Sequence, residues 1–127
     1  MTRALADTSL FAAVEQDRPL RGEAPGEVSV SVVTTAELRA GVLVASDVDV
    51  RARRLATLRQ AETFDPVPVD DDVAHAWARL RVALREQRRR MPVNDSWIAA
   101  TAMALGIPVA TQDDDYDDVP GLEVIRL

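Results

Sequence analysis

Strand-like and helix-like segments alternate along this 127-residue chain from one end to the other. Short apolar segments typical of β-strands occur at residues 3–6, 28–32, 66–69, 107–110 and 122–125. Longer segments with helical spacing lie between most of them. This order is typical of α/β proteins, in which helices cover both faces of a mostly parallel sheet, so we expect that architecture here.

Helices are predicted at residues 10–15, from about 34 to 45, 47–63, 70–90 and 94–105. Side chains that can accept a hydrogen bond from the first free backbone N–H groups mark their starts: Thr34 or Thr35, Asp47, Asp70, and Asn94 or Asp95. Gly106 follows the last helix, where a left-handed residue commonly ends a helix. There is no repeat, low-complexity tract or internal boundary, which predicts a single domain over residues 1–127.

The composition excludes several kinds of chemistry. The chain has no cysteine, so it has neither disulfides nor thiolate metal sites, and a metal must be held by oxygen or by the single His75. All 15 basic residues are arginine, which disfavours Walker-type phosphate loops, receiver domains and Schiff-base enzymes, because these use a lysine. The net charge of -6 disfavours bulk electrostatic coating of nucleic acid and requires a local basic face instead.

No apolar run is long enough to span a bilayer, and the first residues lack the long apolar segment of a secretory signal. We therefore expect a soluble, cytoplasmic protein without a membrane partner.

Four carboxylates, each near a strand or helix end, form the candidate functional site: Asp7, Glu37, Asp95 and Asp113. Ligands of open parallel sheets bind beyond the carboxyl ends of the strands, and three of these residues follow predicted strands. Asp95 instead opens the helix that leads into the strand at 107–110. Gly41, one turn after Glu37, is expected to leave that carboxylate uncovered.

Several carboxylates in one pocket repel one another unless a divalent cation lies among them. Magnesium is the expected ion, because it prefers oxygen ligands and binds through few direct carboxylates plus substrate phosphate. A bound ion of this kind activates water for phosphodiester hydrolysis without a protein nucleophile.

Ordinary structural roles compete with this interpretation. Acidic residues at helix starts cap helices without catalysing anything, and residues 111–118 could be a solvated acidic loop. An EF-hand is disfavoured, because loop position six is Asp118 rather than glycine and position twelve is Val124 rather than glutamate. His75 fits a packed or surface residue, and Trp97 fits the core or a partner contact better than base stacking.

Arg88, Arg89 and Arg90 lie just before the Asp95 helix. Two interpretations stay open for them: the polar face of a helix, or guanidinium groups that hold RNA phosphates at the rim of the pocket.

Four segments of the chain resemble, in order, the motifs of the PIN-domain nucleases, and within that family the VapC-type toxins of bacterial toxin-antitoxin pairs. They are ALADTSLF, SVVTTAELRAGV, MPVNDSWIAATAMALGIPVAT and TQDDDYDDVPGLEVI. The resemblance implies a three-layer α/β/α sandwich and an endoribonuclease that depends on magnesium or manganese. It also implies a homodimer and an antitoxin whose C-terminal segment blocks the pocket.

Carried onto this chain, the resemblance assigns catalysis to the acidic quartet of Asp7, Glu37, Asp95 and Asp113, with the metal on Asp7, Asp95 and Asp113. It assigns supporting roles to Thr8, Ser9, Thr111 and Asp115. The last motif has Tyr116 where the family usually has phenylalanine, with additional acids around it. Which of Asp113, Asp114 and Asp115 faces the metal therefore stays open.

The leading hypothesis is RNA hydrolysis by metal-activated water, with a 5′-phosphate product and inhibition of translation. Two alternatives remain: an inactive PIN-like module that binds a protein or RNA, and a receiver-type phosphoacceptor, which the absence of lysine disfavours.

Overall fold

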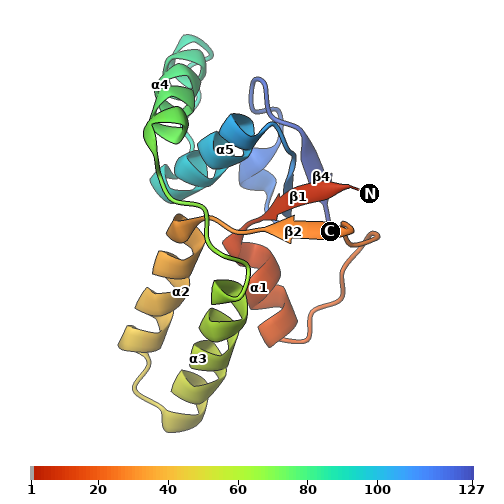
Figure 1. Cartoon of the computed structure of the whole chain (residues 1–127), viewed down its shortest axis with the longest axis vertical. Coiled ribbons are helices and arrows are strands. Elements are labelled where there is room, and N and C mark those ends of the chain that lie inside the picture. Colours follow the sequence, from red (N-terminus) through yellow and green to blue (C-terminus); the bar gives the residue numbers. More distant parts are fainter. Residues whose placement is uncertain (1) are drawn as a thin grey trace.

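A parallel four-stranded sheet forms the centre of the computed structural model, which describes residues 2–127 (Figure 1). Its strands are β1 (Arg3–Ala6), β2 (Glu27–Ser29), β3 (Val109–Thr111) and β4 (Val124–Arg126). They lie in the order β2-β1-β3-β4. The central pair β1 and β3 joins the two ends of the chain, with Leu5 opposite Val109 and Ala6 opposite Ala110.

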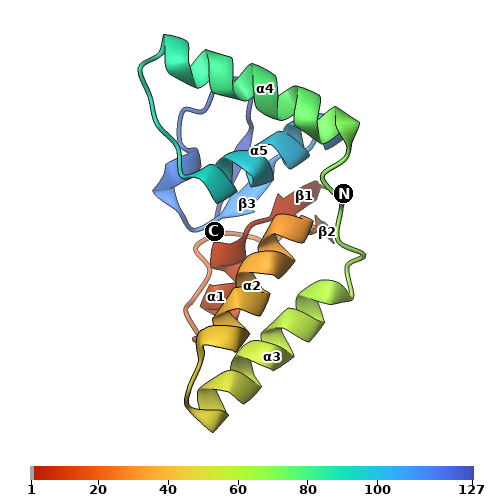
Figure 2. The same ribbon diagram turned by 90° about the vertical axis from the view of Figure 1, so that its left-hand side faces the viewer.

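Helices cover both faces of the sheet. On one side lie α1 (Thr8–Glu15), α2 (Val32–Val44) and α3 (Val48–Glu62), and on the other lie α4 (Asp71–Glu86) and α5 (Val93–Leu105) (Figure 2). A short 3-10 helix, η1 (Asp114–Tyr116), follows β3. The expected three-layer α/β/α sandwich is confirmed.

The alternation of side chains along the central strands creates two separate cores. Ala4, Ala6 and Ala110 pack on the α1 side, whereas Leu5 and Val109 point to the opposite face and pack against α4 and α5. This sorting follows from the strand geometry, because a strand presents its residues alternately to opposite faces.

The predicted cap residues are confirmed at three helix ends. The side chain of Asp47 accepts a hydrogen bond from the N–H of Val50 at 2.9 Å, and Asp70 accepts one from Val73 at 3.0 Å. Gly106 ends α5 in the left-handed conformation, with φ of 68°. These local signals depend only on neighbouring residues, so sequence alone could locate them.

Two predicted helix starts were wrong. Helix α2 begins at Val32 rather than near Thr34, because Ser31 takes the N-cap position and accepts from the N–H of Val33 at 3.0 Å. Helix α5 begins at Val93 with Pro92 as its N-cap, so Asp95 lies inside the first turn and does not cap it.

The predicted strand at 66–69 was also wrong. This segment makes only one bridge to the sheet, between Ser31 and Val67, because Pro66 and Pro68 have no N–H to continue a ladder.

Helix α4 ends at Glu86 rather than near residue 90, since Arg88 turns the chain with a positive φ of 52°. The triplet 88–90 is therefore a loop. Helix α1 and strands β3 and β4 match their predicted positions to within two residues. The predicted strand at 28–32 was too long, because β2 ends at Ser29 and Val32 already belongs to α2.

Over residues 2–127, none of the helices combines the length and hydrophobicity that a bilayer crossing requires.

Candidate active site

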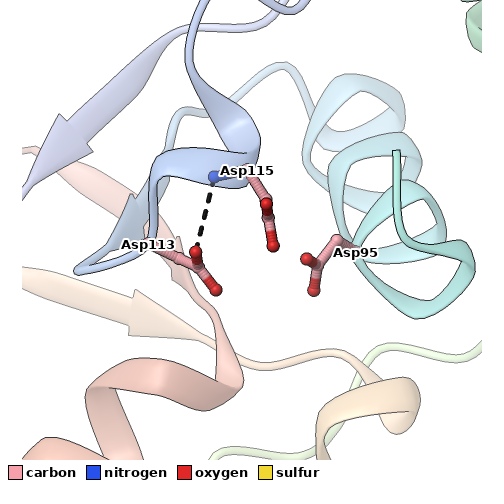
Figure 3. Close-up of side chains that lie close together, drawn as sticks. All are labelled: Asp95, Asp113 and Asp115. Carbon is pink, nitrogen blue, oxygen red and sulfur yellow. Dashed lines mark hydrogen bonds between the residues drawn. The ribbon is translucent and has the colours of Figure 1, made fainter. Parts of the chain in front are cut away.

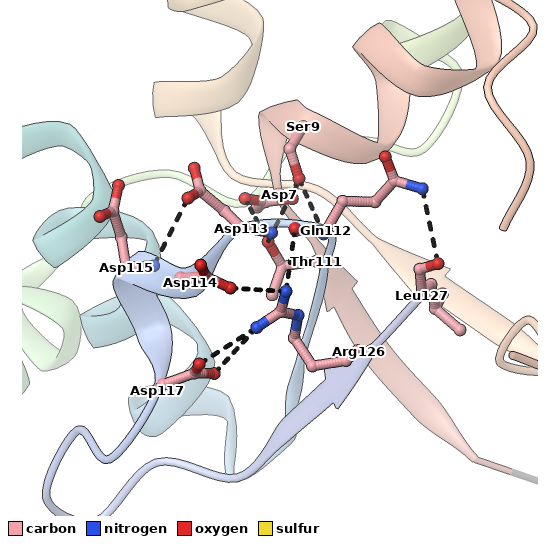
Figure 4. A network of polar contacts seen from close by, with 10 residues as sticks. All are labelled: Asp7, Ser9, Thr111, Gln112, Asp113, Asp114, Asp115, Asp117, Arg126 and Leu127. Atoms are coloured by element: carbon pink, nitrogen blue, oxygen red, sulfur yellow. Dashed lines mark hydrogen bonds and ion pairs between the residues drawn. The ribbon is translucent and has the colours of Figure 1, made fainter. Parts of the chain in front are cut away.

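Asp7 lies at the carboxyl end of β1, in the N-cap position of α1, and only 2% of its surface is exposed. Both carboxylate oxygens accept hydroxyl hydrogen bonds: Oδ1 from Ser9 at 2.7 Å, and Oδ2 from Thr111 at 2.8 Å (Figure 4). Thr111 is the last residue of the neighbouring strand β3, so strand pairing brings it to Asp7 from 104 positions away. The two hydroxyls fix the carboxylate at the top of the sheet.

Glu37 approaches the same region from α2. Its Oε1 accepts a hydrogen bond from the Thr8 hydroxyl at 2.6 Å, and its Oε2 accepts one from the Asn94 amide of α5 at 3.4 Å. A Cβ at Gly41 would meet Arg54 Cδ of α3 at 3.8 Å, so that the glycine lies against α3, and its effect on the exposure of Glu37 stays a prediction. Contacts with α1 and α5 orient this carboxylate.

Three further carboxylates converge beside them. Each of Asp95, Asp113 and Asp115 offers a carboxylate oxygen, and these oxygens lie within 4.8 Å of one another; among the described residues they form the group able to hold a metal ion (Figure 3). Asp95 comes from α5, whereas Asp113 caps η1 and Asp115 lies within it. The backbone N–H of Asp115 donates to Asp113 Oδ1 at 3.4 Å, which orients Asp113.

Asp114 points away from this group. It pairs with Arg126 of β4 at 2.7 Å, and Arg126 also contacts both carboxylate oxygens of Asp117 at 3.1 Å (Figure 4). Within residues 113–115, Asp113 and Asp115 therefore face Asp95, and Asp114 faces the arginine. The hydrogen bond with Asp114 is the main cause that raises the pKa of the Arg126 guanidinium.

Burial perturbs two of the carboxyl groups. It raises the pKa of Asp7 from its ordinary value of 3.8 to about 6, although the hydrogen bonds from Ser9 and Thr111 act in the opposite direction. Burial, followed by the proximity of Asp115, raises the pKa of Asp95 to about 7, although the Tyr116 hydroxyl acts to lower it. Both shifts disfavour the ionised form of these carboxyl groups in the metal-free protein.

The donors present suit a hard divalent cation. All three grouped ligands are carboxylate oxygens, which magnesium and manganese prefer. Two oxygens bound to one magnesium ion lie at most about 4.2 Å apart, so the observed spacing is near that of ligands on a single ion. Asp7 lies beside this group, where the charge of Asp113 contributes to its raised pKa.

An arginine-lined cavity of about 500 Å³ lies at the C-terminal end of α4. It is lined by Arg81, Val82, Leu84, Arg85, Arg88, Arg89 and Arg90. Arg89 Nη2 donates to the backbone carbonyl of Asp115 at 3.3 Å, which connects this basic surface to the acidic one. The predicted triplet 88–90 thus belongs to a larger basic surface.

Sequence reasoning missed Tyr116 and Asn94 as parts of the site. Tyr116 is fully buried, and its hydroxyl donates to Asp95 Oδ1 at 3.2 Å. Burial, followed by the charges of Asp7 and Asp95, raises the pKa of this phenol above its ordinary value. One signal was present in the sequence for each residue: Tyr116 is the single aromatic within the acidic run, and Asn94 precedes Asp95.

The two tryptophans stack on each other. The rings of Trp77 and Trp97 are parallel, with centroids 4.3 Å apart, and Arg81 lies 5.2 Å from the Trp77 centroid. This contact between α4 and α5 agrees with a packing role for Trp97. His75 is exposed on α4.

Comparison with known proteins agrees with this geometry. The PIN domain profile matches residues 4–122. Ribonuclease VapC5 of Mycobacterium tuberculosis (strain ATCC 25618 / H37Rv) is 50% identical over 95% of this chain and 93% of its own length. Ribonuclease VapC4 of the same strain is 51% identical over 98% of this chain and 97% of its own length.

Among solved structures, the crystal structure of VapBC-5 from M. tuberculosis, a member of the VapBC family of toxin-antitoxin systems, superposes with a TM-score of 0.87. It is 44% identical, and the match covers 100% of both chains. This chain belongs to the PIN-domain nuclease family. Within that family it groups with the VapC-type toxins, as its motifs had indicated.

Proposed function

We propose that this protein is a metal-dependent endoribonuclease toxin, formed by a single PIN domain over residues 1–127, that hydrolyses RNA and thereby inhibits translation. The observation that carries the proposal is the convergence of Asp95, Asp113 and Asp115 beside the buried Asp7. Its relatives of about 50% identity are named ribonucleases, which supports RNA as the substrate.

In this proposal Asp95, Asp113 and Asp115 hold magnesium or manganese, and Asp7 adds its negative charge to the same pocket. The bound cation would lower the pKa of a water molecule and neutralise charge on the phosphoryl oxygens. Glu37 would orient the attacking water and accept its proton, and its hydrogen bonds with Thr8 and Asn94 support this role by restraining the carboxylate. Ser9 and Thr111 keep Asp7 in position through their hydroxyls.

The test is cleavage of structured RNA by the purified protein, with Mg²⁺, with Mn²⁺ and with EDTA. Asp7→Asn and Asp95→Asn should each reduce metal-dependent cleavage by a hundredfold or more, on the order seen when one group that stabilises transition-state charge is removed. Asp114→Asn is the matched control, because Asp114 lies in the same loop but pairs with Arg126. Cleavage that survives both Asp7→Asn and Asp95→Asn would refute the assignment.

RNA would reach the metal along the arginine cavity, where Arg85, Arg88 and Arg90 are exposed. Changing each to glutamine should raise KM and reduce the salt dependence of RNA binding by about one unit of slope for each phosphate that is no longer neutralised. Arg51→Gln, on the exposed surface of α3, is the matched control. Equal salt slopes for all four variants would show that the RNA takes another route.

The protein partner in this proposal is an antitoxin whose C-terminal segment covers the acidic pocket, and the protein itself forms a homodimer. Support comes from the solved structure of VapBC-5, which is 44% identical to this chain and is described as a member of the VapBC family of toxin-antitoxin systems. Expression of this chain alone should arrest growth, and co-expression of the open reading frame directly upstream should relieve the arrest. Light scattering of the purified chain tests the dimer. Growth without arrest would favour an inactive binding module.

A further inference from the structure

The candidate metal group is assembled from two chain segments that only the tertiary structure brings together. Asp113 and Asp115 belong to the segment after β3, whereas Asp95 belongs to α5. A cation could be held by all three only if these segments keep a constant spacing. A direct side-chain contact between the two segments would provide that spacing.

Tyr116 makes such a contact. It is the residue after Asp115 in η1, and its hydroxyl donates to Asp95 Oδ1 at 3.2 Å. We propose that Tyr116 is a positioning residue, whose phenol fixes the Asp95 carboxylate relative to Asp113 and Asp115 so that the three can bind one divalent cation. This inference rests on the proposed function, because it assigns the same acidic group to a metal.

The ring and the hydroxyl of Tyr116 have separate environments. The ring is fully buried and packs in the core of Leu80, Leu84 and Ile98, which fixes its position firmly. The hydroxyl alone reaches the carboxylate. A protonated phenol donates one hydrogen bond, which occupies one lone pair of Oδ1 and leaves Asp95 Oδ2 available to a cation.

The segment that carries Tyr116 is itself restrained from two sides. Arg89 donates to the carbonyl of Asp115 at 3.3 Å, and Arg126 holds Asp114 at 2.7 Å. The phenol therefore projects from an anchored backbone, and the hydrogen bond transmits that position to Asp95. Hydrogen bonds to metal-binding side chains typically change metal affinity or activity by about 10–100-fold when removed.

Tyr116→Phe separates the two roles, because phenylalanine fills the same core volume and removes only the hydroxyl. Binding of Mn²⁺ alone, followed by electron paramagnetic resonance at neutral pH, should weaken by about tenfold in this variant, while the circular dichroism spectrum stays unchanged. In an Asp95→Ala background the same change should have no additional effect. RNA cleavage at saturating substrate should fall, with KM for RNA unchanged.

Thr101→Val is the matched control. Thr101 has a fully buried hydroxyl on α5, the helix that carries Asp95. This hydroxyl donates to the carbonyl of Trp97 at 2.8 Å and does not contact Asp95. The variant removes a buried hydroxyl of α5 and should keep the wild-type Mn²⁺ affinity. A loss of affinity equal to that of Tyr116→Phe would mean that general loosening of α5, and not the phenol, is responsible, and would overturn the proposal.

A second measurement does not depend on the stability of the phenylalanine variant. The chain has one tyrosine, so selective ¹³C labelling gives one tyrosine Cζ resonance that reports on this hydroxyl. We expect this resonance to move when Mg²⁺ is added to the wild-type protein, and to move in Asp95→Ala without metal.

The outcomes distinguish this inference from the proposed function. If Asp95→Ala weakens Mn²⁺ binding but Tyr116→Phe does not, or if the tyrosine resonance ignores Asp95→Ala, the positioning role of Tyr116 is refuted and the metal site stands. If Asp95→Ala itself leaves Mn²⁺ binding unchanged, both proposals fall together.

Discussion

The ionised carboxylate of Asp7 should destabilise the metal-free protein at neutral pH. Asp7 is only 2% exposed and its pKa is raised to about 6 from an ordinary 3.8, mainly by burial. Between these two values the folded state holds a proton that the unfolded state has already released. The free energy of unfolding therefore falls as pH rises through this window, and the loss is complete above pH 6.

The size of the effect follows from the shift. A difference of about 2.2 pKa units costs about 3 kcal/mol at pH 8, and the same two-state expression gives about 1 kcal/mol at pH 4.5. Asp7→Asn removes this charge but substitutes an amide, whose weaker hydrogen bonds to Ser9 and Thr111 cost about 1 kcal/mol at either pH. The variant should thus be about 2 kcal/mol more stable than wild type at pH 8, and nearly equal to it at pH 4.5.

Urea unfolding in EDTA at both pH values, followed by tryptophan fluorescence, measures this difference. At pH 8 the expected gain corresponds to a rise in Tm of roughly 5–10 °C. Asp118→Asn provides the control, because Asp118 is exposed and has a positive φ of 57° that asparagine tolerates. If the stability of Asp7→Asn relative to wild type does not increase between pH 4.5 and pH 8, the argument from burial is refuted.

Other perturbations have equally specific expected results. Saturating Mg²⁺ should raise the Tm of the wild-type protein strongly at pH 8 and little at pH 5. The reason is that Asp7 and Asp95 have raised pKa values and must lose protons as the ion binds. Calorimetry in buffers of different ionisation enthalpy would detect the release of these protons. Gly106→Ala should cost about 1 kcal/mol in urea unfolding, since its φ of 68° strains an L side chain although no atom lies within 4 Å, and Gly106→Asn should recover most of that loss. Leu80→Ala should cost about 2–5 kcal/mol in the same assay, because Leu80 of α4 is 1% exposed in the core that it shares with Ile98 and Ala102 of α5. A cost below about 1 kcal/mol would mean that this core is loosely packed.

Much of the fold was predictable because its signals are local. The alternating pattern located β1, and the caps Asp47, Asp70 and Gly106 marked the ends of three helices. The errors arose where two local signals competed. Ser31 outcompeted Thr34 as a cap, and the prolines around Val67 left one bridge where an apolar segment had predicted a strand.

The candidate site was predictable in membership more than in geometry. The sequence identified Asp7 and Glu37 from their places after strands, and the structure brings both to one region with Asp95. It did not distinguish Asp115 from Asp114, because adjacent acids have the same local pattern. Their directions differ only because η1 turns one toward α5 and the other toward Arg126.

By itself, the sequence determined the order of strands and helices and the carboxylates that end them, because propensity, capping and side-chain alternation act over a few residues. The tertiary structure alone decided which oxygens meet. Thr111 reaches Asp7 across 104 positions, and Tyr116 reaches Asp95 across 21. Such contacts depend on the strand order β2-β1-β3-β4, which results from the packing of the whole chain and not from any one segment.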